Sequence, residues 1–281
     1  MAKKLLSGIA PMLLCTAVAL TACANKQDTV ERTKSKSLVV YYSQTGATKQ
    51  VANIMAEAVG ADIDSIVAAN PYNGDFQATI ARCQAEFEKG EVPEVKPLNA
   101  DIAAYDTIFI GYPVWFGTVA QPTAGWLKTV DLSRKVIIPF CTFGSGGLNS
   151  STEAIKKAAP NATFVEGYGV RNARVAKAKA EIETFLIRRG IKAGEVAEEQ
   201  PFSEQKALTK DDQAIFDAAC GDYPMPLGTP VTVGSRAIDG GTEYLFVAES
   251  QSPKGEPVKA EIYVTVGNEE GAKPEFTNVE R

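Results

Sequence analysis

The feature that most constrains the fold of this chain is an alternation of short apolar runs with amphipathic stretches between residues 38 and 190. The run Leu38–Tyr42 is apolar at every position, which is typical of a strand buried on both faces of a parallel sheet. A stretch with apolar residues at helical spacing follows it. This alternation predicts an α/β domain with a doubly wound, five-stranded parallel sheet. The predicted strands are residues 38–42, 61–67, 107–111, 135–141 and 163–168. Besides the helix that begins after residue 46, the predicted helices are 76–89, 122–130, a segment capped by Ser150 or Ser151 and ending at 159, and 173–189.

Residues 1–22 have the order of a targeting segment and are set aside from the fold. Lys3 and Lys4 precede an apolar stretch that is short for a membrane span. Leu20-Thr21-Ala22-Cys23 resembles the lipobox of bacterial lipoproteins, which implies cleavage before Cys23 and a lipid on its thiol. An ordinary signal peptide or an uncleaved anchor is the alternative. Residues 23–37 then form a polar tether, and we expect export and lipid anchoring to a bacterial membrane, at its periplasmic face or the cell surface.

Composition excludes several functional classes. With 34 acidic and 29 basic residues, the chain has a net charge of −5, which argues against a nucleic-acid partner. The sequence contains no histidine, so Ser-His and Cys-His nucleophiles and histidine-based metal sites are ruled out. Its cysteines form no C-x-x-C pair and indicate no disulfide framework. We predict no metal ion, and we can name no catalytic acid or base.

The pattern changes after residue 190. Residues 191–202 read as a linker rich in glutamate. Beyond it, Thr209 and Asp212 have the spacing of a capping box, which predicts a helix to about Cys220. Three longer β-prone runs follow, over 231–238, 243–249 and 258–266, separated by turns. The predicted domains are an α/β domain at 38–190 and a small α+β domain, a helix plus an antiparallel sheet, at 203–281.

Three loops follow predicted strands at their carboxyl ends, where open parallel sheets bind ligands. The first loop, Ser43–Thr48, joins a strand to a helix N-terminus and adds hydroxyl donors, which favours an anion. It lacks the lysine of a P-loop, so a nucleoside triphosphate with magnesium is not expected. The second loop, Tyr112–Gly117, holds consecutive aromatic residues that need a flat partner when exposed. The third loop, Phe143–Gly147, has glycines that let backbone amides approach a ligand.

Each loop also has a simpler interpretation. A Ser/Thr-Gly turn is common as a plain helix N-cap, and aromatic residues such as Trp115 and Phe116 are often core or interface residues. Glycine-rich loops are weak signals when they stand alone. The joint placement of all three loops after the expected strands is what favours a ligand site, because a phosphate site, flat aromatic rings and backbone donors are the parts of a flavin mononucleotide (FMN) site.

Residues 38–190 resemble the flavodoxin-like family, and the first loop matches its hydroxyl-rich phosphate loop. The stretches GYPVWFG at 111–117 and IPFCT at 138–142 are similar to a bacterial branch of that family. The resemblance implies FMN phosphate on the first loop, Trp115 against the isoalloxazine ring, and backbone contacts from residues 114–117 and 143–147. The cofactor-binding residues that it implies are Ser43, Gln44, Thr45, Gly46, Ala47, Thr48, Pro113, Val114, Trp115, Phe116, Gly117, Phe143, Gly144, Ser145, Gly146 and Gly147.

The chain departs from this branch at one position. The branch tends to carry a histidine after the position of Thr142, where this sequence has Phe143. We expect the Phe143 side chain to add apolar cover to the ring without a hydrogen bond.

The C-terminal region is similar to the cystatin-like fold in its helix and in the runs GTEYLFV at 241–247 and KAEIYVTV at 259–266. The glutamine-led hairpin with which cystatins block cysteine proteases is not recognisable over 235–241. A hairpin bearing tryptophan is also missing from 267–276. We therefore expect a docking or spacer role for this region rather than protease inhibition.

The sequence as a whole predicts a membrane-tethered, FMN-binding redox protein, either an electron carrier or a reductase of a small acceptor such as a quinone, with an unidentified redox partner. The flavin supplies the chemistry in this class, and the protein supplies binding and electrostatics. Lys3-Lys4 is not a twin-arginine signal, so the chain is exported unfolded and captures FMN outside the cytoplasm. The alternative is a non-catalytic surface lipoprotein with an empty flavodoxin-like scaffold, which acts as a binding or assembly module through its C-terminal domain.

Overall fold

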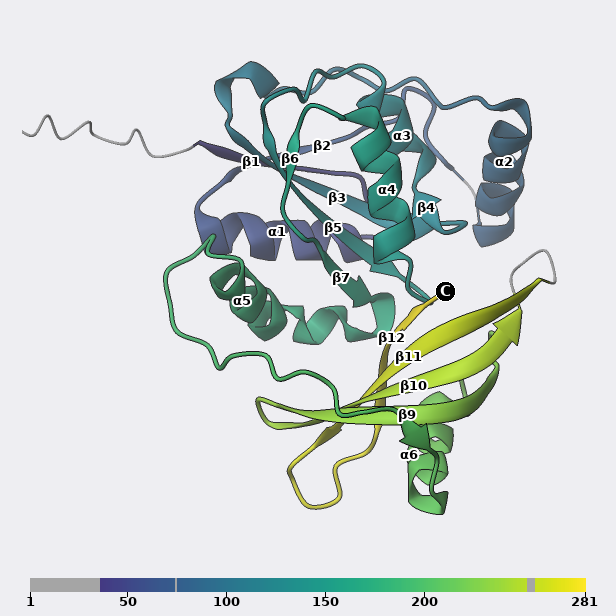
Figure 1. The fold of residues 1–281 in the computed structure, drawn as a ribbon. Coiled ribbons are helices and arrows are strands. Elements are labelled where there is room, and N and C mark those ends of the chain that lie inside the picture. The colour runs from purple at the N-terminus through teal and green to yellow at the C-terminus, as the bar shows by residue number, and fades with distance from the viewer. Residues whose placement is uncertain (1–35, 74, 252–255) are drawn as a thin grey trace, which may run out of the picture. The chain divides into compact units, whose positions relative to one another are not determined.

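The computed structural model of the chain describes residues 36–281 except Gly74 and residues 252–255. The predicted targeting segment, Cys23 and nearly all of the predicted tether lie outside the described residues. Figure 1 shows two β-sheets, each packed against helices of its own. Every helix in the described part of the chain is too short or too polar to span a lipid bilayer.

The first sheet is parallel along its main path. Its strands are β1 (Ser37–Tyr41), β2 (Asp62–Ser65), β3 (Thr107–Trp115), β5 (Val136–Phe143), β6 (Thr163–Phe164) and β7 (Tyr168–Arg171), with β4 (Thr118–Val119) added as an antiparallel hairpin to β3. The strand order is β2-β1-β3-β5-β6, so the order of the chain reverses between β1 and β3. This arrangement confirms the predicted doubly wound parallel sheet.

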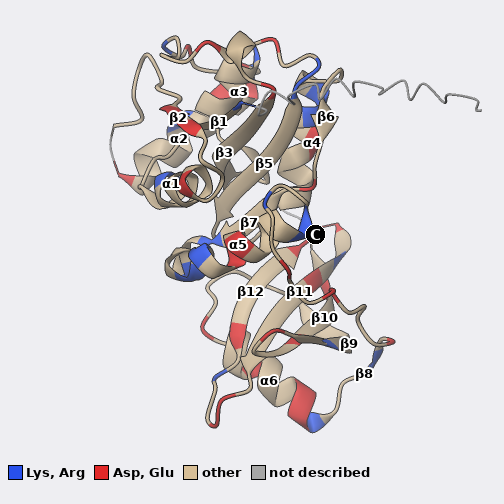
Figure 2. Ribbon diagram, turned by 90° about the vertical axis from the view of Figure 1, so that its left-hand side faces the viewer, with Lys and Arg blue, Asp and Glu red and all other residues tan. Residues whose placement is uncertain are grey.

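Helices cover both faces of this sheet (Figure 1). They are α1 (Ala47–Val59), α2 (Phe76–Lys89), α3 (Gln121–Leu127), α4 (Leu148–Ala158) and α5 (Ala178–Arg188), with 3-10 turns at Ile102–Ala104 and Asn172–Lys177. Because side chains alternate along a strand, Val39 of β1 packs with α1 and α5, whereas Val40 packs with the core beside α3 and α4. Figure 2 shows basic and acidic residues next to one another along α5.

The fifth predicted strand is divided into two short strands. β6 pairs with Val136 and Ile137 at the start of β5, and β7 pairs with the end of β5 from Phe140 onward. Pro139 lies between these two paired regions of β5 and has no N–H to donate to a neighbouring strand. The carbonyl of Pro139 also lies 2.5 Å from the place that a Cβ of Gly167 would take. The proline therefore accounts for the break.

The second sheet is antiparallel, in the order β12-β11-β10-β9-β8. Its elements are β8 (Lys206–Ala207), α6 (Lys210–Cys220), β9 (Thr229–Ile238), β10 (Gly241–Gln251), β11 (Pro257–Gly267) and β12 (Glu275–Glu280). One face is covered by α6, whose Phe216 ring meets the ring of Phe246 at 5.2 Å. A helix with an antiparallel sheet was predicted here and is confirmed, but β8 and β12 were not predicted.

The start of α6 follows the predicted capping box. The N–H of Asp212 donates to Oγ1 of Thr209 at 3.2 Å, and the N–H of Thr209 donates to Oδ2 of Asp212 at 2.9 Å. These bonds satisfy two donors that a helix N-terminus leaves unpaired. The bond from the Thr209 backbone lowers the pKa of Asp212.

We expect Thr209→Ala to lower the free energy of unfolding by about 1 kcal/mol, because it removes the cap of α6. Since the folded-state pKa of Asp212 is depressed, the contribution of its carboxylate is present above the unfolded-state value and is lost as the pH falls through the folded-state value. Urea denaturation at pH 7 and in acid measures both effects. Asp211→Ala, an exposed residue in the same turn, is the control and should change stability by less than about 0.5 kcal/mol. Equal effects of the two variants contradict the cap.

Candidate functional site

The carboxyl ends of β1, β3 and β5 meet at one edge of the parallel sheet, because the strands run side by side in the same direction. The three predicted loops begin at this edge, next to the point where the strand order reverses. One glycine of each loop faces open space. Among the described residues, no atom lies within 4 Å of the place that a Cβ would take at Gly46, Gly117 or Gly144. A ligand can therefore approach the backbone of all three loops.

The first loop leaves the N-terminus of α1 open. Gly46 is the N-cap, has a φ of 97° and provides no side chain to cap the helix. Its N–H donates to Oγ of Ser43 at 3.1 Å, and Thr45 beside it is exposed. The first turn of α1, which begins at Ala47, contains no acidic residue. The positive end of the helix dipole thus meets solvent, which is the geometry of an anion site.

Two side chains of the first loop point into the protein. Gln44 donates from Nε2 to the carbonyl of Tyr72 at 2.7 Å, and its Oε1 accepts a bond from the Tyr42 hydroxyl. Burial raises the pKa of Tyr42, which keeps this hydroxyl protonated. Oγ1 of Thr48 lies 2.8 Å from Oγ1 of Thr142, and both residues are buried. These two side chains hold the loop in place, so only their backbone groups are left for a ligand.

The second loop is shorter than predicted, because β3 continues to Trp115 and the chain returns as β4 from Thr118. Phe116 and Gly117 form the turn, with φ angles of 52° and 76°. Positive φ at both central residues is the pattern of a type I′ turn, which a bulky residue rarely adopts. Phe116 is nevertheless 59% exposed, and its ring meets the ring of Phe87 at 5.6 Å. Strain of this kind clusters at functional sites.

The indole of Trp115 is half-buried and fixed by two tyrosines. Its ring centroid lies 5.7 Å from that of Tyr42 and 5.4 Å from that of Tyr72, both in edge contacts. Trp115 is therefore held between Tyr42, which directly precedes the first loop, and Tyr72, which lies in the segment between β2 and α2. The predicted contact residues Pro113 and Val114 are half-buried within β3.

The third loop differs from expectation in two ways. Phe143 belongs to β5, is 2% exposed and lies in the core, so its side chain does not fit the expected role of covering a flavin ring. Helix α4 starts after Gly147, so the predicted Ser150 or Ser151 cap is wrong. Ser150 instead donates from Oγ to the carbonyl of Gly117 at 2.7 Å, which connects the second and third loops.

The last strand of the chain contacts the third loop, a contact that the sequence pattern did not indicate. The carbonyl oxygen of Val279 is 1.7 Å from the place that a Cβ of Gly146 would take, so only glycine fits there. Arg171 of β7 donates from Nε to the carbonyl of Gly144 at 3.1 Å and from Nη1 to the carbonyl of Phe276 at 2.8 Å. Part of the glycine requirement in this loop thus comes from β12 and not from a ligand. Ser145, between these glycines, is half-buried.

Among the residues that the structure describes, the site holds no reactive cysteine and no cluster of metal ligands. Cys141 of β5 is fully buried, and burial raises the pKa of its thiol well above the ordinary value. In the described part of the chain, no group of three or more His, Cys, Asp or Glu side chains is arranged to hold a metal ion. The site therefore consists of backbone donors, hydroxyls and aromatic rings.

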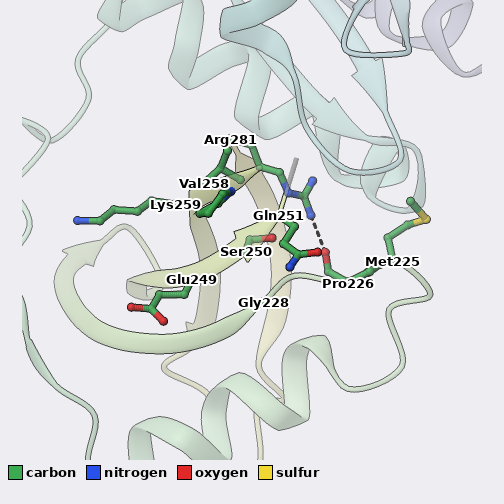
Figure 3. Close-up of a pocket in the computed structure, with 10 residues that line it drawn as sticks. Met225, Pro226, Gly228, Glu249, Ser250, Gln251, Val258, Lys259 and Arg281 are labelled. Carbon is green, nitrogen blue, oxygen red and sulfur yellow. Dashed lines mark hydrogen bonds between the residues drawn. The ribbon is translucent and has the colours of Figure 1, made fainter. Parts of the chain in front are cut away.

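A separate hollow of about 1090 Å³ lies on the second sheet (Figure 3). Met225, Glu249, Lys259 and Arg281 are among the residues that line it, and the lining includes none of the predicted cofactor-binding residues. Figure 3 shows the guanidinium of Arg281 bonded to the carbonyl of Pro226, at 2.8 Å. The loops at the edge of the parallel sheet remain the candidate site.

Comparisons with known proteins find matches to the first part of the chain. The family model described as flavodoxin matches residues 36–185, which include all three loops and leave β8–β12 outside the match. No curated protein matches the chain.

Solved structures also match the first part of the chain. A candidate flavoprotein from Bacteroides eggerthii is 29% identical with a TM-score of 0.50, over 56% of this chain and 99% of its own. A similar protein from Bacteroides uniformis is 26% identical with a TM-score of 0.49, over 54% of this chain and 97% of its own. A flavoprotein from Lactobacillus acidophilus, crystallised in complex with FMN, is 24% identical with a TM-score of 0.44, over 51% of this chain and 97% of its own.

We expect Thr48→Val to lower the free energy of unfolding by about 1–3 kcal/mol, because it leaves the buried hydroxyl of Thr142 without its partner. The double variant Thr48→Val/Thr142→Val should recover most of this loss, since both polar groups are then replaced by similar apolar shapes. Urea denaturation of the single and double variants measures the coupling. A double variant that loses the sum of the two single losses contradicts the pairing.

Proposed function

The chain belongs to the flavodoxin family, and on that premise we propose that it is a membrane-tethered redox protein with FMN as its cofactor. The observation that carries the proposal is the open N-terminus of α1 at Gly46, which lies beside the aromatic cluster of Trp115 at the switch point of the sheet. A helix N-terminus binds phosphate, and an aromatic side chain supports a flat ring. FMN carries both groups in one molecule.

Different residues bind the phosphate and the ring of FMN. The backbone N–H groups of Ala47 and Thr48, with the hydroxyls of Ser43 and Thr45, hold the phosphate at the first turn of α1. Trp115 and the backbone of the second and third loops, where Gly117 and Gly144 face open space, would hold the ring. These donors and the helix dipole would stabilise the phosphate charge without a lysine.

Bound FMN supplies the redox chemistry, and the protein keeps the ring in a fixed apolar setting. Tyr42 and Tyr72 hold the Trp115 ring, and the hydrogen bond from Ser150 to Gly117 holds the second loop. Because these groups are already ordered before FMN binds, the entropy cost of ordering them on binding is lower. The protein then works as an electron carrier or as a reductase of a small acceptor such as a quinone.

Titration of the purified chain with FMN tests the proposal. We expect quenching of FMN fluorescence by the wild type, and weaker binding by about tenfold in Trp115→Ala through loss of aromatic contact. Thr45→Asp should weaken binding by more than about tenfold, because it places a negative charge beside the phosphate. The controls are Phe76→Ala, an aromatic residue that is 75% exposed on α2, and Thr163→Asp, the same charge change at the other edge of the sheet. If the wild type does not quench FMN fluorescence, the proposed redox function is wrong and the non-catalytic lipoprotein is favoured.

Cys23 is the residue to which we assign the lipid of the proposed membrane anchor. It follows Leu20-Thr21-Ala22 in the order of a lipobox. We expect the intact chain to fractionate with membranes and to incorporate a radiolabelled fatty acid. Cys23→Ser should abolish the label, whereas Cys15→Ser, in the apolar stretch before the cleavage point, should leave it unchanged. Label that persists in Cys23→Ser contradicts lipid attachment at this thiol.

A further inference from the structure

The side chain of Tyr72, whose ring contacts Trp115, is held at several points. Its hydroxyl donates to Oε2 of Glu86 at 2.5 Å, and the guanidinium of Arg82 lies over its ring, 3.7 Å from the centroid. Its backbone carbonyl accepts the bond from Nε2 of Gln44 at 2.7 Å. Burial raises the pKa of Tyr72, and the bond to Glu86 adds to this rise, so the hydroxyl stays protonated and can donate. Tyr72 therefore has a fixed position against Trp115.

The carboxylate of Glu86 connects Tyr72 to helix α2. While Oε2 accepts from Tyr72, Oε1 accepts from Nε of Arg82 at 2.9 Å, one turn earlier on the helix. Nη1 of Arg82 also donates to the carbonyls of Asn70 and Pro71, at 3.0 Å each. A carboxylate serves two such donors with its two oxygens, whereas a side-chain amide has a single acceptor oxygen. The ion pair therefore ties the segment before α2 to the helix.

The same part of α2 reaches the second loop. Cys83 is buried in one cluster with Tyr72, and Trp115 packs against that cluster. The ring of Phe87 meets the ring of Phe116, in the turn after β3, at 5.6 Å. Figure 1 accordingly shows α2 beside the hairpin of β3 and β4. Both aromatic residues of the second loop therefore rest on α2 or on the side chain that α2 holds.

We propose that Arg82 and Glu86 are positioning residues of the flavin site, which fix the ring of Trp115 through Tyr72. The proposal rests on the proposed function, because it needs FMN to bind at Trp115. Neither charged residue belongs to the three loops, and both act through the tyrosine. When the ion pair is broken, the Tyr72 ring gains other positions, and FMN binding then includes the entropy cost of ordering Trp115.

The test measures the dissociation constant of FMN by fluorescence titration in the wild type and its variants. Glu86→Gln should weaken FMN binding about fivefold, because one amide oxygen cannot accept from both Tyr72 and Arg82. Tyr72→Phe, which removes only the hydroxyl, should weaken it by a similar factor. The double variant should also lose about fivefold and not the product of about 25-fold, since both changes break the same link. Glu88→Gln, an exposed carboxylate on the same helix, is the control and should stay within about twofold of the wild type.

Quenching of tryptophan emission by acrylamide gives a second reading, without FMN. The chain has two tryptophans, and Trp126 is buried in the core, so the quencher reports mainly on the half-buried Trp115. Quenching should increase in Glu86→Gln and in Tyr72→Phe, and it should stay unchanged in Glu88→Gln. A role of the ion pair in the stability of α2 alone would lower the free energy of unfolding without this change and without the coupling to Tyr72.

The outcomes separate the two proposals. If the losses of FMN affinity multiply in the double variant, or if quenching is unchanged in Glu86→Gln, the positioning role is wrong while FMN binding by the wild type stands. If the wild type does not bind FMN, the proposed function is wrong and this inference is overturned with it.

Discussion

The site depends on the parallel pairing of β1, β3 and β5. Val39, Phe109 and Ile138 lie side by side in register on these strands and are almost completely buried. Because the pairing is parallel, the three strands end at the same edge of the sheet, and their loops begin next to one another. The open helix at Gly46 and the aromatic ring of Trp115 face a common edge only as a result of this register.

The second sheet reaches the same edge through β12. The backbone of Val279 occupies the space over Gly146, and Arg171 joins the third loop to β12 by bonding to the carbonyls of Gly144 and Phe276. The third loop is thus fixed by β7 and β12, two parts of the chain that are far apart in sequence. The first loop has no such covering at Gly46 among the described residues, and this is the reason that we propose it as the phosphate site.

The sequence predicted most of the elements because their signals are local. The helix over residues 76–89 and the capping box of Thr209 and Asp212 follow from short-range periodicity and spacing, and both are confirmed. The side-chain roles in the site were harder to predict. Thr48 bonds to Thr142 and Phe143 enters the core, because neighbouring strands decide which way each side chain points. The short strand Glu275–Glu280 mixes polar and apolar residues and has no pattern strong enough to predict its partner.

By itself, then, the sequence determined the class of fold, the order of its elements and the position of the three loops along the chain. These follow from hydrophobic periodicity and turn residues, which act over a few residues. Only the tertiary structure decided that Gly147 is the N-cap of α4, that Phe116 closes a strained hairpin, and that the backbone of Val279 lies against Gly146. These features depend on contacts between residues far apart in the chain, and such contacts form only once the chain has folded.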